Sequence, residues 1–97
     1  MRGFFAFQGG MFFTYILYSD SLSQYYIGYT SDLDSRIARH NSGGSRYTKR
    51  GVPWRLVYFE SFGTKSEAIS RERFLKRQWN HSFYERLISD FDSSLLD

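Results

Sequence analysis

Two short runs rich in aromatic and β-branched residues constrain the fold of this chain most strongly. Residues 12–18 read FFTYILY and residues 24–29 read QYYIGY, and a polar stretch of five residues separates them. Such runs favour β-strands, because their side chains pack well on a pleated surface. A connection this short joins neighbouring antiparallel strands, so the two runs predict a hairpin.

Helix-capping pairs and one further apolar run organise the remainder of the chain. In each pair a Ser or Thr precedes an acidic residue by three positions, as in a capping box: Ser31 and Asp34, Thr64 and Glu67, Ser82 and Glu85. The pairs predict helices over residues 31–41, 64–79 and 82–89, and the run WRLVYFE predicts a third strand over residues 54–60. The order β-β-α-β-α-α indicates an α+β domain, a small three-stranded, mainly antiparallel sheet with flanking helices.

Length and composition limit the domain organisation. The 97 residues suffice for one domain, which we expect over residues 11–90, followed by a C-terminal tail over residues 91–97. Residues 1–10 show no periodicity, so we expect a loose N-terminal extension; an upstream start codon before a natural start at Met11 is one explanation that the sequence leaves open. The absence of cysteine excludes disulfide scaffolds and Cys-ligated zinc. No apolar run approaches the ~18 residues of a membrane span, and we expect a cytoplasmic protein.

Basic residues are concentrated in one part of the chain. Residues 36–86 contain 12 Lys and Arg against four Asp and Glu, a local net charge of +8, whereas the rest of the chain has a net charge of −5. A basic segment in a small domain rich in aromatic residues favours a polyanionic partner, with nucleic acid first. An ordinary solvated surface of Lys and Arg explains the same charge equally well.

Three polar residues fall on helix faces that should be apolar. In the first predicted helix His40 shares the inward face with Leu33, and Arg36 borders that face. The ordinary explanations are a structural histidine and an arginine whose charged end reaches solvent. In the second predicted helix Glu72 falls on the inward stripe, where a carboxylate is costly to bury unless a cation meets it. A metal or an arginine would provide that cation, and so would an ordinary surface pair with Lys76 four residues later.

Gly28 interrupts the second predicted strand. Glycine weakens a strand interior, so its presence predicts a bulge or the close approach of another group. The strand tyrosines carry no such signal, because tyrosine is simply a good sheet residue and periodicity does not select the chemically active ones.

An ordered set of motifs resembles the GIY-YIG nuclease superfamily. Tyr15-Ile16-Leu17 is followed by Tyr26-Ile27-Gly28, then by Arg36, His40 and Glu72 in the two helices. The chain is most similar to the small stand-alone bacterial members and to the N-terminal domain of the excision-repair nuclease. The resemblance implies a metal-dependent DNA endonuclease of low sequence specificity, with DNA repair as its setting.

The resemblance also implies a role for each matching residue. Tyr15 would assist deprotonation of the attacking water, and Tyr26 would position that water or the scissile phosphate. Arg36 would hold the phosphate and stabilise the charge of the transition state. Glu72 would bind a single divalent ion, Mg²⁺ or Mn²⁺. His40 occupies a position that some members use to assist the tyrosine or to contact phosphate.

A basic loop completes the predicted DNA interface. We expect five residues to follow the phosphate backbone: Arg46, Tyr47, Lys49, Arg50 and Arg55. Such contacts carry no sequence information, so we expect cleavage selected by DNA structure, branched or flapped DNA included. A non-catalytic nucleic-acid-binding module of the same fold is the first alternative. A protein-interaction domain with exposed aromatic residues is the second.

Overall fold

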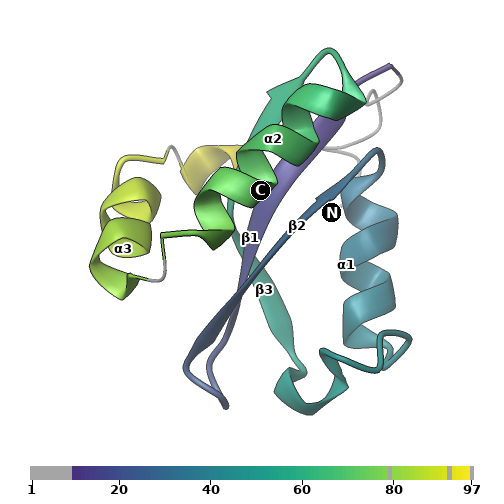
Figure 1. Ribbon diagram of the computed structural model, residues 1–97. Helices are drawn as coiled ribbons and strands as arrows, with labels where there is room; N and C mark the ends of the chain where they lie inside the picture. The colour runs from purple at the N-terminus through teal and green to yellow at the C-terminus, as the bar shows by residue number, and fades with distance from the viewer. Residues whose placement is uncertain (1–9, 79, 92, 97) are drawn as a thin grey trace.

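The two aromatic runs form the hairpin of a three-stranded sheet in a computed structural model of the protein, which describes residues 10–78, 80–91 and 93–96. The strands are β1 (Phe12–Ser19), β2 (Gln24–Thr30) and β3 (Trp54–Phe62). The strand order is β2-β1-β3 and both pairings are antiparallel, as predicted. Strand β1 is therefore central, and β2 forms one edge of the sheet (Figure 1).

In the part of the chain that the structure describes, three α-helices follow in the predicted order. They are α1 (Leu33–Asn41), α2 (Lys65–Lys76) and α3 (His81–Ser89). The order β-β-α-β-α-α and the α+β class are thus confirmed. Two 3₁₀ turns, η1 (Lys49–Gly51) and η2 (Ser93–Leu96), were not predicted, because elements this short carry no periodic signal.

Thr64 caps the start of α2 and pairs with Glu67, as predicted. The Thr64 hydroxyl accepts a hydrogen bond from the Glu67 backbone N–H at 3.2 Å and donates one to the Glu67 carboxylate at 3.0 Å. The helix ends at Lys76, three residues before the predicted end. The predicted last residue, at position 79, lies outside the described residues.

The other two helix caps were predicted at the wrong residue. Asp32, not Ser31, caps α1 by accepting a hydrogen bond from a backbone N–H of the first turn. Asn80, not Ser82, caps α3 by accepting from the backbone N–H groups of Ser82 and Phe83. Asp and Asn cap helices at least as well as Ser, and both observed caps have the extended backbone that a cap requires.

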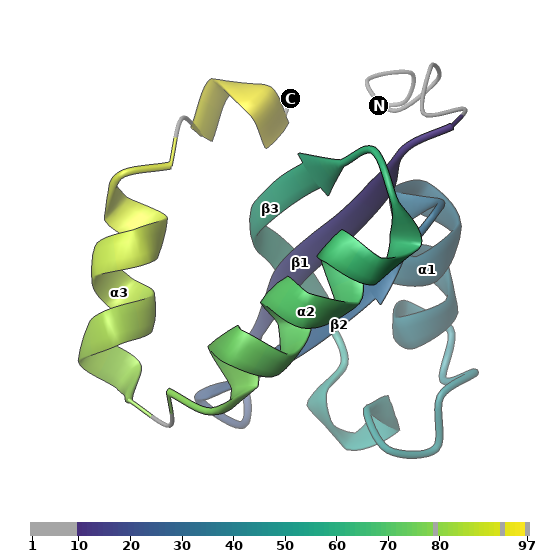
Figure 2. The same cartoon turned by 45° about the horizontal axis from the view of Figure 1, so that its top comes forward.

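Alternating side chains of β1 separate two hydrophobic layers on opposite faces of the sheet. The layer against α1 contains the buried residues Phe13, Tyr15, Leu17, Leu33 and Trp54. The layer against α2 and α3 contains the buried residues Ile16, Ile27, Tyr58, Leu75 and Tyr84. Figure 2 shows α2 crossing in front of the sheet with α1 behind it. The helices therefore approach the open edge of β2 from both faces.

The structure describes most residues of the C-terminal end and only one of the first ten residues. The expected extension over residues 1–10 lies outside the described residues except for Gly10. Beyond α3 the Phe91 ring packs with its centroid 5.2 Å from that of Tyr58 and 5.4 Å from that of Phe59. A membrane-crossing helix, long and apolar enough to span a bilayer, is not found in the described ranges.

Candidate active site at the edge of β2

Tyr15 reaches the edge of the sheet because the neighbouring strand has a glycine beside it. Tyr15 and Gly28 are register partners in β1 and β2. A Cβ atom at position 28 would lie 2.6 Å from the Tyr15 hydroxyl oxygen, so the phenol occupies the space that a side chain would fill. The pairing of β1 with β2 is continuous through this position. Of the two alternatives predicted for Gly28, close approach is confirmed and a bulge is not present.

His40 extends from α1 to the same hydroxyl group. Its side chain is buried, as the helix periodicity predicted, with 2% of the residue exposed. The Nε2 atom lies 3.2 Å from the Tyr15 hydroxyl, and Nδ1 lies 2.8 Å from the Thr48 hydroxyl. The Tyr26 ring packs edge to face on the imidazole, with centroids 4.8 Å apart. These three contacts hold the ring of His40 in one orientation.

The surroundings of Tyr15 keep its hydroxyl protonated at neutral pH. Burial raises the pKa of Tyr15 to about 12, and the neighbouring Tyr26 adds to the rise. The nearby Arg36 side chain, with its N–H groups and positive charge, acts in the opposite direction and lowers the pKa. The negative charge of Glu72 raises it slightly. Arg36 and Glu72 therefore both act on the same phenol, although they come from different helices.

The surroundings of His40 keep its ring neutral. Burial lowers the pKa of His40 below its usual 6.5, and the positive charges of Arg36 and Arg39 lower it further. A neutral imidazole carries a proton on only one ring nitrogen. At pH 7 the other nitrogen is therefore free to accept a proton.

Arg36 is anchored at the edge of the sheet, one turn before His40 in α1. Its Nη1 atom donates a hydrogen bond to the backbone carbonyl of Tyr29 in β2 at 3.3 Å. The side chain is half-buried. A guanidinium has five N–H donors in a planar fork, so donors remain for two oxygens of a phosphate.

Glu72 approaches from the other face of the sheet, on α2. Its side chain is 15% exposed, and Oε2 pairs with the Lys76 ammonium at 3.1 Å. The ordinary explanation for this inward acid, a pair with the residue four positions later, is therefore confirmed. The same carboxylate is still close enough to Tyr15 to affect the pKa of that phenol.

The donor chemistry of Glu72 fits a divalent ion held by one protein ligand. The described residues contain no cluster of three or more His, Asp or Glu that would form a complete metal cage. Mg²⁺ prefers oxygen ligands, keeps several waters and commonly takes one or two carboxylates together with a substrate phosphate. A single, mostly buried carboxylate meets that requirement, and Lys76 would compete with the ion for it.

The loop between α1 and β3 is organised by two residues at its ends. The Asn41 side chain donates to the Trp54 carbonyl at 2.9 Å and accepts from the Trp54 backbone N–H at 2.6 Å. The Trp54 indole N–H then donates to the Thr48 carbonyl at 2.6 Å. Thr48 is buried as a result, with 1% of the residue exposed. Sequence reasoning assigned no role to Thr48, since one threonine in an irregular loop has no periodic signal.

The residues predicted to bind DNA separate into two groups. Four are exposed on the loop: Arg46, Tyr47, Lys49 and Arg50. Tyr47 is 85% exposed, and its ring centroid lies 6.3 Å from that of Tyr26. Arg55 instead turns to the end of the hairpin, where it pairs with Asp20 at 3.1 Å and lies over the Tyr18 ring. The structure thus brings Tyr47 to the candidate site and directs Arg55 elsewhere.

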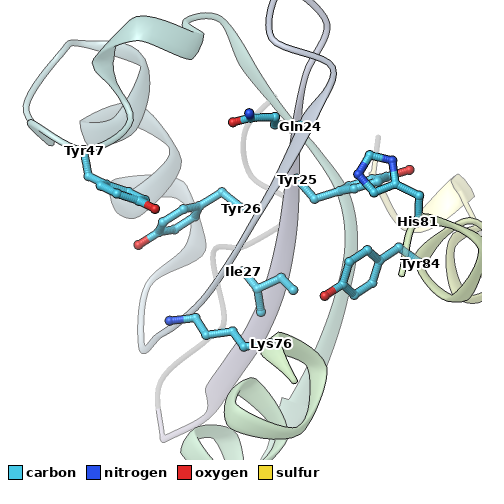
Figure 3. Close-up of a pocket in the computed structure, with 8 residues that line it drawn as sticks. All are labelled: Gln24, Tyr25, Tyr26, Ile27, Tyr47, Lys76, His81 and Tyr84. Atoms are coloured by element: carbon cyan, nitrogen blue, oxygen red, sulfur yellow. The ribbon is translucent and has the colours of Figure 1, made fainter. Parts of the chain in front are cut away.

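A groove with a volume of about 790 Å³ follows the open edge of β2. Figure 3 shows Tyr26 and Tyr47 at one end, with the Lys76 ammonium extending to the same side. Side chains of β2 and α3 form the other end, among them Tyr25, His81 and Tyr84. Tyr26 is the candidate catalytic residue in the lining of this groove, which continues onto a largely aromatic surface.

An antiparallel sheet whose edge gathers two tyrosines with arginine, histidine and glutamate side chains from two helices has the make-up of a GIY-YIG nuclease domain. The family described as the GIY-YIG catalytic domain matches residues 11–85. The chain belongs to this family.

Its relatives are small proteins named UPF0213. A UPF0213 protein of Streptococcus pneumoniae serotype 4 (strain TIGR4) is 45% identical over 73 residues, which cover 74% of each chain. A UPF0213 protein of Pediococcus acidilactici is 43% identical over 70 residues, covering 69% of this chain and 70% of the relative. The solution NMR structure of the UPF0213 protein BH0048 from Bacillus halodurans is similar with a TM-score of 0.51 at 38% identity. It covers 81% of this chain and 83% of that chain.

Proposed function

We propose that this protein is a metal-dependent endonuclease that hydrolyses DNA phosphodiester bonds with low sequence specificity. One observation carries the proposal: the Tyr15 hydroxyl lies 3.2 Å from the neutral His40, and the charges of Arg36 and Glu72 act on the same hydroxyl. Strand β1 and helices α1 and α2 provide these four groups, so they meet only in the folded chain. Membership of a nuclease-domain family supports the same conclusion.

Tyr15 and His40 would provide the path for the proton of the attacking water. With a pKa of about 12, Tyr15 is not a phenolate at neutral pH in the free protein. It can still accept a proton from water if it gives its own proton to His40 in the same step. The imidazole can accept that proton because the ring is neutral at pH 7, as its lowered pKa implies. The pair would thus act together as the general base.

Arg36 and Tyr26 would hold the phosphate and the water. Cleavage places negative charge on the phosphate oxygens and on the leaving oxygen, so a fixed cation lowers the energy of the transition state. The guanidinium of Arg36 is anchored on the Tyr29 carbonyl and has further donors for two of those oxygens. Tyr26 packs on His40 and lines the groove, next to the path that a substrate would take.

Glu72 would be the protein ligand of a divalent ion, Mg²⁺ or Mn²⁺. When bound, such an ion supplies Lewis-acid stabilisation of the phosphate charge. Glu72 itself would fix the position of the ion relative to Tyr15. The mostly buried position of its side chain supports this role, because surrounding atoms restrict how far the carboxylate can move.

The loop and the groove would bind the DNA. Exposed Arg46, Lys49 and Arg50 are suited to phosphates, and aromatic rings such as that of Tyr47 can stack on bases. Contacts of this kind read no sequence, so selection would depend on DNA structure, such as branches or flaps. A role in DNA repair and a cytoplasmic location belong to the same proposal.

The test is a cleavage assay on linear, flapped and branched DNA with Mg²⁺, Mn²⁺ or EDTA. The wild-type protein should cleave in the presence of metal and not in EDTA, and Glu72→Gln should lower the rate roughly 100-fold. Glu85→Gln, which changes an exposed carboxylate on α3, is the matched control and should cleave normally. Metal-dependent cleavage that is unaffected by Glu72→Gln would contradict the mechanism. Salt-sensitive binding without cleavage in any metal would favour the non-catalytic binding module.

A further inference from the structure

We propose that Thr48 is a positioning residue of this site, whose hydroxyl accepts the Nδ1 proton of His40 and so keeps Nε2 free to face Tyr15. The inference rests on the proposed nuclease function, since it concerns the residue that would accept the Tyr15 proton. Thr48 would not touch the substrate, and would act only through the tautomer of His40.

The His40 ring connects two buried hydroxyl groups. Its Nδ1 atom lies 2.8 Å from the Thr48 Oγ1 atom, and its Nε2 atom lies 3.2 Å from the Tyr15 hydroxyl. At most 2% of each of the three residues is exposed. Because the neutral ring has a single N–H, one nitrogen donates and the other accepts. The two distances alone allow either arrangement, so the direction of the proposed proton transfer must distinguish them.

The proposed proton transfer distinguishes the two arrangements. His40 can accept the Tyr15 proton at Nε2 only if that nitrogen carries no proton of its own. Nε2 is the ring nitrogen that faces the Tyr15 hydroxyl, at 3.2 Å. Nε2 is therefore the unprotonated nitrogen. The ring proton lies on Nδ1, where it is donated to the Thr48 hydroxyl.

The backbone of Thr48 is held by contacts that do not involve His40. Its carbonyl accepts hydrogen bonds from the Trp54 indole N–H at 2.6 Å and from the Gly51 backbone N–H at 3.0 Å. Its own N–H donates to the Ser45 carbonyl at 3.2 Å. The hydroxyl is thus presented from a fixed backbone, as a residue that orients a histidine requires.

The arrangement accounts for each proton in the proposed step. The attacking water gives a proton to the Tyr15 oxygen as the water oxygen bonds to phosphorus. The bond from phosphorus to the leaving oxygen breaks, its electron pair stays on the leaving oxygen, and that oxygen takes up a proton from solvent. At the same time the Tyr15 O–H bond breaks and an Nε2–H bond forms, which leaves His40 as an imidazolium. Its Nδ1–H continues to donate to Thr48, so the hydrogen bond at that end is the same before and after the transfer.

The tautomer can be measured directly by NMR on ¹⁵N-labelled protein at pH 7.5. Long-range proton–nitrogen correlations of the His40 ring should show protonated Nδ1 and unprotonated Nε2 in the wild-type protein. Thr48→Val keeps the shape but removes the acceptor, so the ring should shift towards the Nε2–H form. The kcat for DNA cleavage should fall roughly 10- to 100-fold in this variant with little change in KM, as expected when a catalytic base is held in the wrong form. Thr48→Ser restores a hydroxyl and should restore the wild-type tautomer and most of the rate.

Two results would overturn the proposal. One is an Nε2–H tautomer in the wild-type protein, which needs no variant and so decides the matter even if Thr48→Val does not fold. The other is a folded Thr48→Val protein whose tautomer is unchanged. A wild-type protein that has the expected tautomer but cleaves no DNA would contradict the nuclease function and leave the assignment of Thr48 as the acceptor in place.

Discussion

The Tyr15 hydroxyl lies over Gly28, 2.6 Å from the point at which any other residue would place its Cβ atom. Tyr15 is fully buried, so its ring has no solvent-filled space into which it could move. The glycine lets the phenol cross the edge strand and meet His40 beyond it. A missing side chain in β2 is therefore as important for the candidate site as the tyrosine in β1.

Gly28→Ala should destabilise the protein and displace the phenol. The added methyl group would overlap the Tyr15 ring, and overpacking of this kind costs about 1–3 kcal/mol. Urea denaturation measures the loss of unfolding free energy, and the cleavage assay measures displacement of the hydroxyl. Gly63→Ala is the control, because no atom lies within 4 Å of the Cβ it would add. Equal changes in the two variants would show that the contact with Tyr15 is not responsible.

Acidification should destabilise the fold through His40. Burial and the charges of Arg36 and Arg39 lower the pKa of His40 below the 6.5 of an unfolded chain, so below pH 6.5 the unfolded state binds more protons. Above pH 6.5, protonation of His40 should therefore not reduce the unfolding free energy. The unfolding free energy should decrease as the pH falls through the folded-state pKa, by at most about 1.4 kcal/mol per pH unit.

Urea denaturation between pH 7.5 and pH 5.5 measures this dependence. His40→Gln should remove the part of the slope that comes from the buried ring. His81→Gln, at an exposed position in α3, should leave the slope unchanged. A slope that survives in His40→Gln would assign the pH dependence to other groups.

Loss of the loop cations should reduce the salt dependence of DNA binding. Each Lys or Arg that neutralises a phosphate of duplex DNA contributes about 0.9 to the slope of log K against log salt concentration. Lys49→Ala and Arg50→Ala should each reduce the slope by up to that amount, as measured by fluorescence anisotropy between 50 and 200 mM salt. Arg55→Ala should have a smaller effect, because its guanidinium is already paired with Asp20. An effect of Arg55→Ala as large as that of the loop variants would contradict this division.

Lys76→Met should make the site easier to load with metal. The ammonium of Lys76 pairs with Glu72 at 3.1 Å, and a helical pair of this spacing contributes about 0.3–0.5 kcal/mol. Its removal should lower the Mg²⁺ concentration that gives half-maximal cleavage roughly twofold. Lys65→Met changes an exposed lysine at the start of the same helix and should leave that concentration unchanged. A higher Mg²⁺ requirement in Lys76→Met would show that the lysine assists the substrate and does not compete with the ion.

The order of elements could be predicted because its signals are local. The aromatic and β-branched content of β1 and β2 and the capping pair of Thr64 and Glu67 depend on residues within a few positions of one another. The observed cap of α1, Asp32, lies one residue after the predicted cap, Ser31, because local signals do not separate neighbouring candidates. Both side chains can cap a helix, and the path of the chain leaving β2 selects between them.

Periodicity alone predicts that His40 and Glu72 turn inward, and a glycine inside a strand predicts either a bulge or a close approach at Gly28. The direction of a side chain relative to its own strand or helix is set by local backbone geometry. The contacts between elements follow instead from the order β2-β1-β3, which leaves β2 at an edge reached by helices from both faces. That packing places Thr48 against His40. It also places Glu72 close enough to Tyr15 to raise the pKa of the phenol. These partners come from separate elements, and their contacts depend on how the whole domain buries its apolar surface.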